Sequence, residues 1–311
     1  MTNHAPTTDT VAAPRGTATA TASKPRKIPK RRKKTLLQHV KKTPIYLVIA
    51  FLFFIELYPL FWMFMSSLKS RDDYLNNPAW SLPTELIWSN YPAAWEQGNL
   101  AITIRNSLLA TLPALAIIII LGVAAGFALE VMIFKGRGGI LLTVLAGIMI
   151  PGQMILLPLF TIYSNLHITG TLWPLILTYA ATGLPLTIFM MATFFKAIPR
   201  EIFEAATIDG ASILRSYRSI AFPMVRNAIV TVALVQFFLI WNDLLLAITF
   251  ANRKELQTVQ AGLLSFSGDF GALDYGPLFA AICITTGGLL VIYLFLNQKI
   301  MKGLTAGSLK G

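Results

Sequence analysis

Residues 196–227 read KAIPREIFEAATIDGASILRSYRSIAFPMVRN, and this polar stretch separates two long apolar runs at residues 172–195 and 226–250. Pro199 suits the first turn of a helix. Asp209-Gly210 indicates where that helix ends, because glycine accepts the positive φ of a helix C-terminus. Between them, apolar residues recur at helical spacing, at Ile202, Phe203 and Ala206. The first half of the stretch therefore predicts a short amphipathic helix.

The second half of the stretch predicts another short helix. Ser212 can cap its beginning, and Pro223 is expected to end it, because proline cannot donate the backbone hydrogen bond. One face would carry Ile213, Leu214, Tyr217 and Ile220. An exposed apolar face on such a helix favours docking in a groove of a partner protein. Two alternatives are a loop lying on lipid and a helix-turn-helix reader of DNA, which the flanking apolar runs disfavour.

The composition places the chain in a membrane. Of its 311 residues, 55% are hydrophobic and 13% are charged, and a soluble chain cannot cover its surface with so few charges. This excludes an ordinary soluble enzyme and a largely disordered chain. A membrane helix needs about 20 apolar residues. Six runs reach that length, so we predict an all-α polytopic membrane protein with six transmembrane helices at residues 45–68, 104–134, 140–163, 172–195, 226–250 and 277–298.

The distribution of Lys and Arg sets the predicted orientation. If the amino terminus is cytoplasmic, 21 of the 26 Lys and Arg fall in cytoplasmic segments and five in outer segments. Cytoplasmic segments normally carry the excess of positive charge. Both termini and residues 196–227 are therefore predicted to be cytoplasmic. The first apolar run is longer than a signal-peptide core of about 7–15 residues, so we expect an uncleaved anchor.

The tail before the first span has two parts. Residues 1–23 are rich in Thr, Ala and Pro, which is typical of disorder. Residues 24–42 hold ten Lys and Arg. A basic segment beside a span indicates a topogenic and lipid-binding role. A specific protein contact and nucleic-acid binding are the alternatives.

Polar residues inside the spans are candidates for a translocation pathway. A charge at the bilayer centre costs about 2.5–3.5 kcal/mol on insertion scales, so it should face protein or water. The candidates are Glu56, Gln153, Asn242 and Asp243, and structural hydrogen bonding to a neighbouring helix is the alternative. Gly122 with Gly126, and likewise Gly287-Gly288, would permit close approach of helices.

The sequence indicates no chemistry of its own. Cys283 is the single cysteine, and His4, His39 and His167 lie too far apart to form a local ligand cluster. The motifs GxxxxGK[ST], HExxH and GxSxG do not occur. We therefore expect no catalytic residue, no metal and no cofactor bound by this chain.

At this point the cytoplasmic stretch resembles a known family. Glu204-Ala205-Ala206, Gly210, Ile220 and Phe222-Pro223 have the spacing of the EAA loop of binding-protein-dependent ABC importers. In their inner-membrane permease subunits, this loop forms coupling helices that dock in a cleft of the cytoplasmic ATPase. The resemblance implies the type I importer permease fold. It assigns ATPase coupling to Glu204, Ala205, Ala206, Asp209, Gly210, Ile220 and Pro223.

Two further stretches are similar to the carbohydrate uptake group and to its six-span maltose-type permease. Trp241-Asn242-Asp243 looks like the WND segment of that group, and residues 302–311 (KGLTAGSLKG) look like its carboxyl tail. That tail reaches the ATPase dimer, so the resemblance implies ATPase contacts at Gly303, Leu304, Thr305, Gly307 and Lys310. The outer loop 252–276 would contact the solute-binding protein through Ser265, Phe266, Asp269 and Phe270.

The resemblance also implies a domain organisation. It comprises a disordered basic cytoplasmic tail (1–43), the first transmembrane helix (44–68), an extracytoplasmic loop (69–103), a permease core of five helices (104–298) with the coupling loop 197–225, and a cytoplasmic carboxyl tail (299–311).

The implied function is ATP-driven import of a carbohydrate, either an oligosaccharide or a disaccharide, by alternating access across a bacterial or archaeal cytoplasmic membrane. The implied partners are a second homologous permease subunit, two ATP-binding subunits that bind ATP and Mg²⁺, an extracytoplasmic solute-binding protein and the lipid membrane, with no nucleic acid. One alternative is the same machinery for a non-sugar or modified-sugar solute such as a glycerol phosphate ester. A different class is an ion-coupled secondary transporter.

Overall fold

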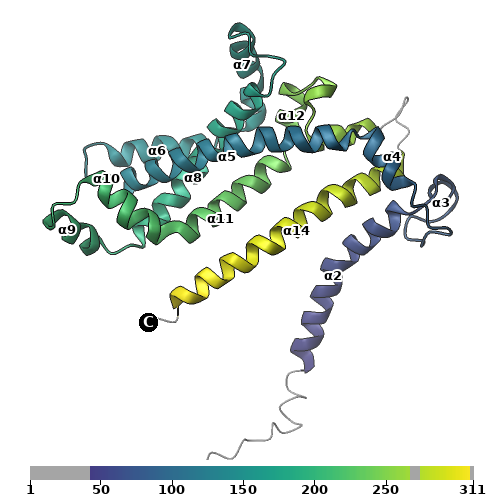
Figure 1. Cartoon of the computed structure of the whole chain (residues 1–311), viewed down its shortest axis with the longest axis horizontal. Helices are drawn as coiled ribbons and strands as arrows, with labels where there is room; N and C mark the ends of the chain where they lie inside the picture. The colour runs from purple at the N-terminus through teal and green to yellow at the C-terminus, as the bar shows by residue number, and fades with distance from the viewer. Residues whose placement is uncertain (1–42, 267–273, 309–311) are drawn as a thin grey trace, which may run out of the picture. The chain divides into compact units, whose positions relative to one another are not determined.

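A computed structural model of the chain describes residues 43–266 and 274–308, with side chains at 44–266 and 274–294. Every regular element in these residues is helical, which confirms the predicted all-α class (Figure 1). The chain forms two compact units that divide between Ile55 and Glu56. The described part of the first is the amino-terminal half of α2 (Thr43–Ser67), whose apolar side chains are exposed. All other helices belong to the second unit.

The described residues contain the apolar helices that six spans require. Five helical stretches are long and apolar enough to cross a membrane, and a bent helix pair supplies a sixth if it counts as one span. The five are Pro44–Ser67 in α2, Leu100–Glu130 (α5), Trp173–Lys196 (α8), Ile213–Trp241, and Tyr275–Leu294 in α14 (Tyr275–Ser308). Since α5 begins at Leu100, the second span starts four residues before the predicted position.

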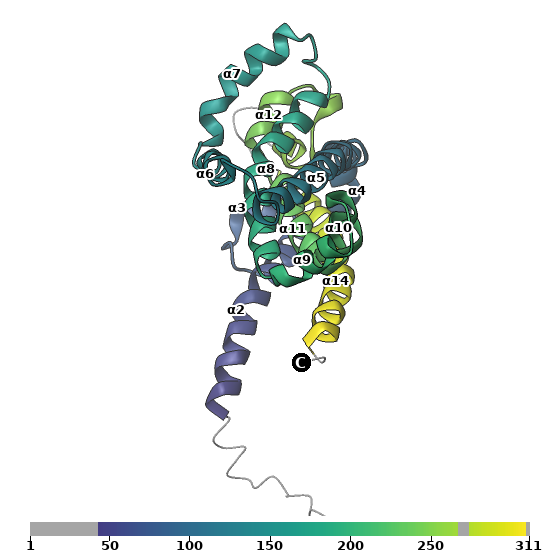
Figure 2. The same cartoon turned by 90° about the vertical axis from the view of Figure 1, so that its left-hand side faces the viewer.

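The predicted third span is not one straight helix. It consists of α6 (Arg137–Ile148) and α7 (Gly152–Asn165), which meet at a bend of 96°. Pro151 causes the break, because it has no N–H to donate and disfavours helical geometry at the residue before it. Figures 1 and 2 both show α7 leading away from the end of α6. Pro59, Pro113, Pro158 and Pro185, in contrast, remain inside their helices.

The core of the second unit is the close pair of α5 and α8. Glycine at two positions of α5 allows this approach: a Cβ on Gly122 would collide with Thr187, and one on Gly126 would lie 2.7 Å from the Met191 Cβ. The predicted close packing at Gly122 and Gly126 is therefore confirmed. Gly287 and Gly288 in α14, in contrast, have no described atom within 4 Å of the position that a Cβ would occupy.

The last helix of the bundle's core is α11 (Phe222–Trp241), which packs against α5, α8 and α14 (Figure 1). Its buried residues follow helical spacing at Val225, Ile229, Val232, Gln236 and Ile240. Gln236 is 2% exposed, and its Nε2 donates to Gly183 O and Thr187 Oγ1, at 2.9 Å each. This polar contact ties α11 to α8 at the same turn of α8 that meets Gly122.

The segment that follows α2 is held by one buried carboxylate. Asp73, in α3 (Arg71–Asn76), is 2% exposed and forms a capping box with Ser70. Its carboxylate accepts further bonds from Thr84 Oγ1 at 2.8 Å and from Asn77 Nδ2 at 2.9 Å. Burial alone would raise the pKa of the Asp73 carboxyl, but these hydrogen bonds outweigh it and hold that pKa below its usual value. The segment continues to α4 (Asn90–Gln97).

The α5–α8 contact gives a first prediction. Gly126→Ala should destabilise the folded chain by about 1–3 kcal/mol, because the new methyl group has to displace Met191 or the α8 backbone. Gly139→Ala is the matched control. Gly139 also lies inside a helix, but a Cβ added there would have no described atom within 4 Å. Thermal unfolding of the purified protein in detergent measures both. Equal midpoints for the two variants would contradict the close packing.

Candidate functional site

The segment 196–227 forms the helix pair that the sequence predicts. The first helix, α9 (Arg200–Ile208), follows Pro199 and is closed by Asp209 and Gly210. Gly210 has φ +76° and donates its N–H to Thr207 O at 3.0 Å, while Ala211 N donates to Ala206 O at 2.9 Å. These two bonds make a Schellman turn, in which glycine avoids the penalty that a Cβ meets at positive φ.

The second helix begins as predicted but does not end at Pro223. Ser212 caps α10 (Ile213–Ser216) by accepting from Arg215 N at 3.3 Å. The chain then continues through a π-helical turn, η1 (Tyr217–Ala221), directly into α11. The expectation that proline ends the helix was wrong, because the wider π turn precedes Pro223 and Pro223 occupies the first turn of α11. The segment is therefore continuous with a membrane helix.

An aromatic cluster fastens this segment to the helix pair α5 and α8. Phe127 of α5 is its centre, with ring centroids 5.6 Å from Phe195 of α8, 6.1 Å from Phe203 of α9 and 5.1 Å from Tyr217 of η1. Phe127 and Phe195 are buried, at 4% and 1% exposure. Such ring pairs add about 0.5–1.5 kcal/mol each beyond the area they bury.

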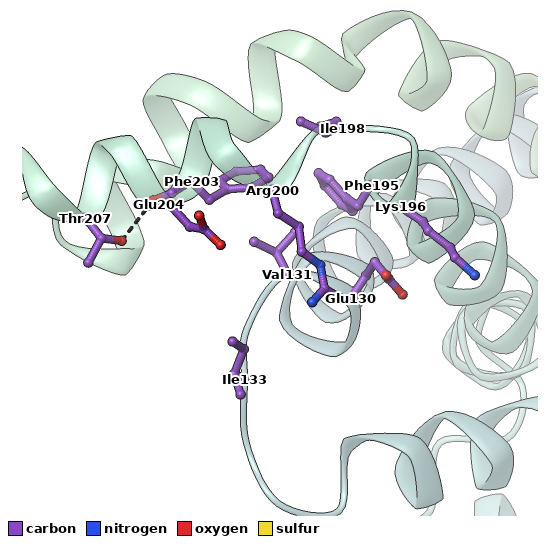
Figure 3. Close-up of a pocket in the computed structure, with 10 residues that line it drawn as sticks. All are labelled: Glu130, Val131, Ile133, Phe195, Lys196, Ile198, Arg200, Phe203, Glu204 and Thr207. Atoms are coloured by element: carbon purple, nitrogen blue, oxygen red, sulfur yellow. Dashed lines mark hydrogen bonds between the residues drawn. The ribbon is translucent and has the colours of Figure 1, made fainter.

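Beside the cluster lies an open cleft of about 390 Å³ between α9, the carboxyl-terminal end of α5 and the carboxyl-terminal end of α8. Its walls carry charges of both signs, from Glu130, Lys196, Arg200 and Glu204. Figure 3 shows Arg200 extending from α9 into the cleft on the side of Glu130, and Glu204 one turn further along α9. Phe195 and Phe203 also line the cleft, so its walls carry aromatic rings beside the charged groups (Figure 3).

The tip of the segment is apolar and exposed. Ile208 is 86% exposed, Ile213 60% and Leu214 56%. Tyr217 and Ile220, predicted for the same face, are half-buried, and Tyr217 packs on Phe127. The tip and the cleft thus form a surface suited to docking a protein rather than to bond chemistry.

The structure separates the seven residues that the resemblance assigns to coupling. Ala206 is buried and Ile220 is half-buried, so these two hold the segment in place. The other five are exposed and available to a partner: Glu204, Ala205, Asp209, Gly210 and Pro223.

The predicted pathway residues do not gather at one place. Glu56 lies exposed on α2, and Gln153 lies exposed in the first turn of α7. Asn242 and Asp243 follow the end of α11, where Tyr179 of α8 donates its hydroxyl hydrogen to Asp243 Oδ2 at 2.9 Å. The sequence predicted no role for Tyr179 or for the buried Gln236, because these side chains gain their partners only when α8 packs on α11.

The loop 252–276, which is predicted to be extracytoplasmic, is fixed at its base by α5. Asn106 Nδ2 donates to Glu255 O at 2.7 Å and to Gln257 O at 3.1 Å, and Val259 N donates to Ser107 Oγ at 2.8 Å. Between α11 and the loop lies α12 (Leu245–Phe250), and the loop itself contains η2 (Lys254–Leu256), α13 (Val259–Gly262) and η3 (Leu263–Phe266).

Of the loop residues predicted to contact a binding protein, Ser265 is exposed. Phe266 is 1% exposed in a core with Ala94 and Leu100, so it anchors the loop instead of presenting its ring to solvent. Asp269 and Phe270 lie outside the described residues, as does Lys310 of the carboxyl tail. The tail residues Gly303, Leu304, Thr305 and Gly307 continue α14. No group of three His, Cys, Asp or Glu that could hold a metal ion occurs in the described ranges.

The chain matches the sequence profile of one protein family over most of its length. The profile of the binding-protein-dependent transport system inner membrane components matches residues 101–298, which include the spans from α5 to α14 and the helix pair. The chain belongs to this family. It is therefore a multi-pass inner-membrane protein and a permease subunit of a transport system.

Two relatives and one solved structure place this permease among similar proteins. It is 34% identical to the probable ABC transporter permease protein YurM of Bacillus subtilis, over 85% of this chain and 87% of that protein. It is 33% identical to the diacetylchitobiose uptake system permease protein NgcG of Streptomyces coelicolor, over 82% of this chain and 85% of that protein. A chain of a bacterial ABC transporter involved in alginate import has the same fold, with a TM-score of 0.69 at 18% identity over 86% of this chain and 98% of that one.

The aromatic cluster of the permease gives the second prediction. Phe203→Ala should speed hydrogen–deuterium exchange of the amides in residues 200–212 by about tenfold, because about 1.4 kcal/mol of ring contact holds α9 against Phe127. Phe189→Ala is the control, since Phe189 is 43% exposed on α8 and lies outside the cluster. Unchanged exchange at residues 200–212 in Phe203→Ala would show that the cluster does not fix α9.

Proposed function

We propose that this chain is a permease subunit of an ATP-driven importer that carries a carbohydrate across the cytoplasmic membrane by alternating access. The names of its relatives support a carbohydrate: NgcG belongs to a diacetylchitobiose uptake system, and the transporter of similar fold imports alginate. The chemistry of the solute is that of a hydroxyl-rich molecule, an oligosaccharide or disaccharide.

The observation that carries this proposal is the construction of the cytoplasmic segment. Its apolar tip is exposed, while its base is fixed to α5 and α8 through Phe127 and is continuous with α11. A partner that binds the tip and moves it therefore also moves α5, α8 and α11. This is the arrangement that a motor subunit needs to switch a permease between inward and outward opening.

The motor is a separate ATPase in this proposal. The sequence has no GxxxxGK[ST] loop to cradle a nucleotide phosphate, so ATP and Mg²⁺ belong to two ATP-binding subunits that dock on the tip and cleft. Glu204, Ala205, Asp209 and Gly210 form the exposed part of this docking surface, and the end of α14 extends it. The chain itself catalyses no reaction.

Two further partners complete the proposed transporter. Apolar side chains are exposed on α2 and on α7, for example at Leu157. We assign these surfaces to contact with lipid and with a second homologous permease subunit. The family is named for its dependence on a binding protein, and we assign the contact with an extracytoplasmic solute-binding protein to the outer loop that Asn106 holds in place.

Coupling through the segment gives the third prediction. Gly210→Val should leave membrane insertion intact but lower sugar uptake and ATPase attachment at least about tenfold, because a branched side chain resists positive φ and distorts the turn. Glu204→Ala should act in the same direction more mildly. The measurements are ATPase copurified per permease, hydrolysis stimulated by the binding protein, and uptake into vesicles.

Gly136→Val is the matched control for this experiment. Gly136 also has positive φ, at +86°, and a Cβ added there would likewise have no described atom within 4 Å. Unlike Gly210, it lies in the loop between α5 and α6. It should retain uptake near the wild-type rate. Full coupling in Gly210→Val, or equal loss in Gly136→Val, would remove the special role of the segment.

Topology gives the fourth prediction. In a chain in which Cys283 is replaced by serine, Ser212→Cys should react with a membrane-impermeant thiol reagent only after the cells are opened, because 21 of 26 Lys and Arg favour a cytoplasmic segment. Ser265→Cys should react in intact cells. The reverse pattern at the two positions would invert the orientation and exclude docking of a cytoplasmic ATPase at the tip.

A further inference from the structure

The cleft of about 390 Å³ beside the aromatic cluster lies where two membrane helices end. Glu130 is the last residue of α5 and Lys196 is the last residue of α8, and both line the cleft. These helices have 31 and 24 residues. At 1.5 Å per residue, each is longer than the roughly 30 Å of hydrocarbon in a bilayer. The end that they share, and the cleft with it, therefore lies at the level of the lipid headgroups.

The charges of the cleft are balanced in sign. Two cations, on Lys196 and Arg200, stand beside two carboxylates, on Glu130 and Glu204. Across the view of Figure 3 these charges alternate in sign, in the order Glu204, Arg200, Glu130, Lys196. No hydrogen bond or ion pair within the described part of the chain uses any of the four charged groups. All four are therefore available to a ligand.

This balance favours a ligand that itself carries both signs. A simple anion would be attracted by Lys196 and Arg200 but repelled by the two carboxylates, and a simple cation would meet the reverse. A zwitterion can place a phosphate on the cations and an ammonium group on a carboxylate, with charge-assisted hydrogen bonds at both ends. A primary ammonium suits Glu130 better than a quaternary one, because only the primary group has N–H donors.

An exposed apolar surface continues from the charged part of the cleft. Ile133 lines the cleft and is 87% exposed, and Phe134, the next residue in the chain, is 38% exposed. The chain then enters α6, in which no residue is buried and Leu142 is 68% exposed. Acyl chains can cover this surface, whereas a water-soluble zwitterion would leave it uncovered. The occupant that fits both parts is a phospholipid.

We propose that the cleft binds the headgroup of a phospholipid with a primary ammonium group, such as phosphatidylethanolamine. The phosphate lies on Lys196 and Arg200, and the ammonium group donates to the carboxylate of Glu130. The bound lipid thereby joins α9 to the ends of α5 and α8. This inference goes beyond the proposed function, because it requires neither a particular solute nor a particular orientation of the chain in the membrane.

Helix α9 has separate faces for this lipid and for an ATPase. Its cleft residues recur at helical spacing along one face, at Arg200, Phe203, Glu204 and Thr207. Ala205 and Asp209 are exposed and do not line the cleft. An ATPase can therefore bind the tip and the face of Ala205, and reach the cleft at Glu204, while the lipid occupies the part at Lys196, Arg200 and Glu130. An ATPase that fills the whole cleft is the competing occupant.

The first experiment measures access to the cleft in the assembled transporter. With Cys283 replaced by serine, Val131→Cys places a thiol in the cleft wall, and Lys135→Cys is the matched control, because Lys135 is exposed in the same linker but does not line the cleft. The transporter is placed in nanodiscs of phosphatidylcholine alone, or mixed with phosphatidylethanolamine or phosphatidylglycerol. Phosphatidylethanolamine should slow the reaction of Val131→Cys with a small thiol reagent at least about fivefold and leave Lys135→Cys unchanged.

The second experiment changes the charges and counts bound lipid by native mass spectrometry of the full chain. Arg200→Gln and Lys196→Gln should each lower the affinity for phosphatidylethanolamine about tenfold, since hydrogen bonds to charged groups are lost. Glu130→Gln should lower that affinity as well but raise the affinity for phosphatidylglycerol, which has no ammonium group. A merely structural role of Glu130 would not shift the two lipids in opposite directions.

Matched controls are exposed residues of the same charge that do not line the cleft: Lys135→Gln, Arg218→Gln and Glu201→Gln. Each should bind both lipids as the wild type does. Losses in these controls equal to those in the cleft variants would overturn the inference, and so would equal labelling of Val131→Cys in all three membranes.

Two further results would assign the cleft to another occupant. If phosphoethanolamine in solution protects Val131→Cys as well as the lipid does, the ligand is a soluble zwitterion and the lipid is excluded. If phosphatidylethanolamine protects the permease alone but not the assembled transporter, the ATPase fills the cleft. The labelling comparison uses one variant in different membranes, so a charge variant that fails to fold cannot imitate its outcome.

Discussion

The contact of α5 with α8 is the constraint on which the other elements depend. Two glycines one turn apart bring the helix backbones close enough that a single methyl group would meet Met191. Lipid chains are as apolar as leucine, so helix association in a membrane draws on packing and polar contacts rather than on expulsion of water. Gln236 adds such a polar contact, and it places α11 on α8 at the level of Gly183 and Thr187.

The segment of α9, α10 and η1 is held rigid by the same two helices, α5 and α8. Phe127 and Phe195 stand on α5 and α8, and the rings of Phe203 and Tyr217 close around them. The exposed tip is therefore a small surface whose base is fixed by the packed rings on α5 and α8. A partner that binds Ile208 and Leu214 meets side chains whose backbone is already ordered, which reduces the entropy lost on docking.

Local features of the helix pair could be predicted from the sequence, because glycine at positive φ and a serine cap depend on a few neighbouring residues. Gly210 and Ser212 are examples. Features that depend on packing could not. Tyr179 and Asp243 are 64 positions apart and meet only because α8 lies on α11. Prolines show the same limit. Pro223 was expected to end a helix but is accommodated by a π turn, and Pro151 breaks a helix that apolar composition alone joins into one span. Phe266 looked like a contact residue by resemblance, and its burial follows from the core of α4, α5 and α14.

The length of α5 has a mechanical consequence. This one helix of 31 residues carries Asn106 and Ser107, which hold the loop 252–276, near one end, and Phe127, which holds the segment of α9, α10 and η1, near the other. At 1.5 Å per residue it is about 46 Å long, enough to cross the hydrocarbon layer with turns to spare. Because both segments are bonded to one continuous helix, a rigid tilt of α5 moves both of them. Pro113 lies inside this helix and cannot donate a backbone hydrogen bond to the preceding turn, which makes it a position where α5 can bend at low cost.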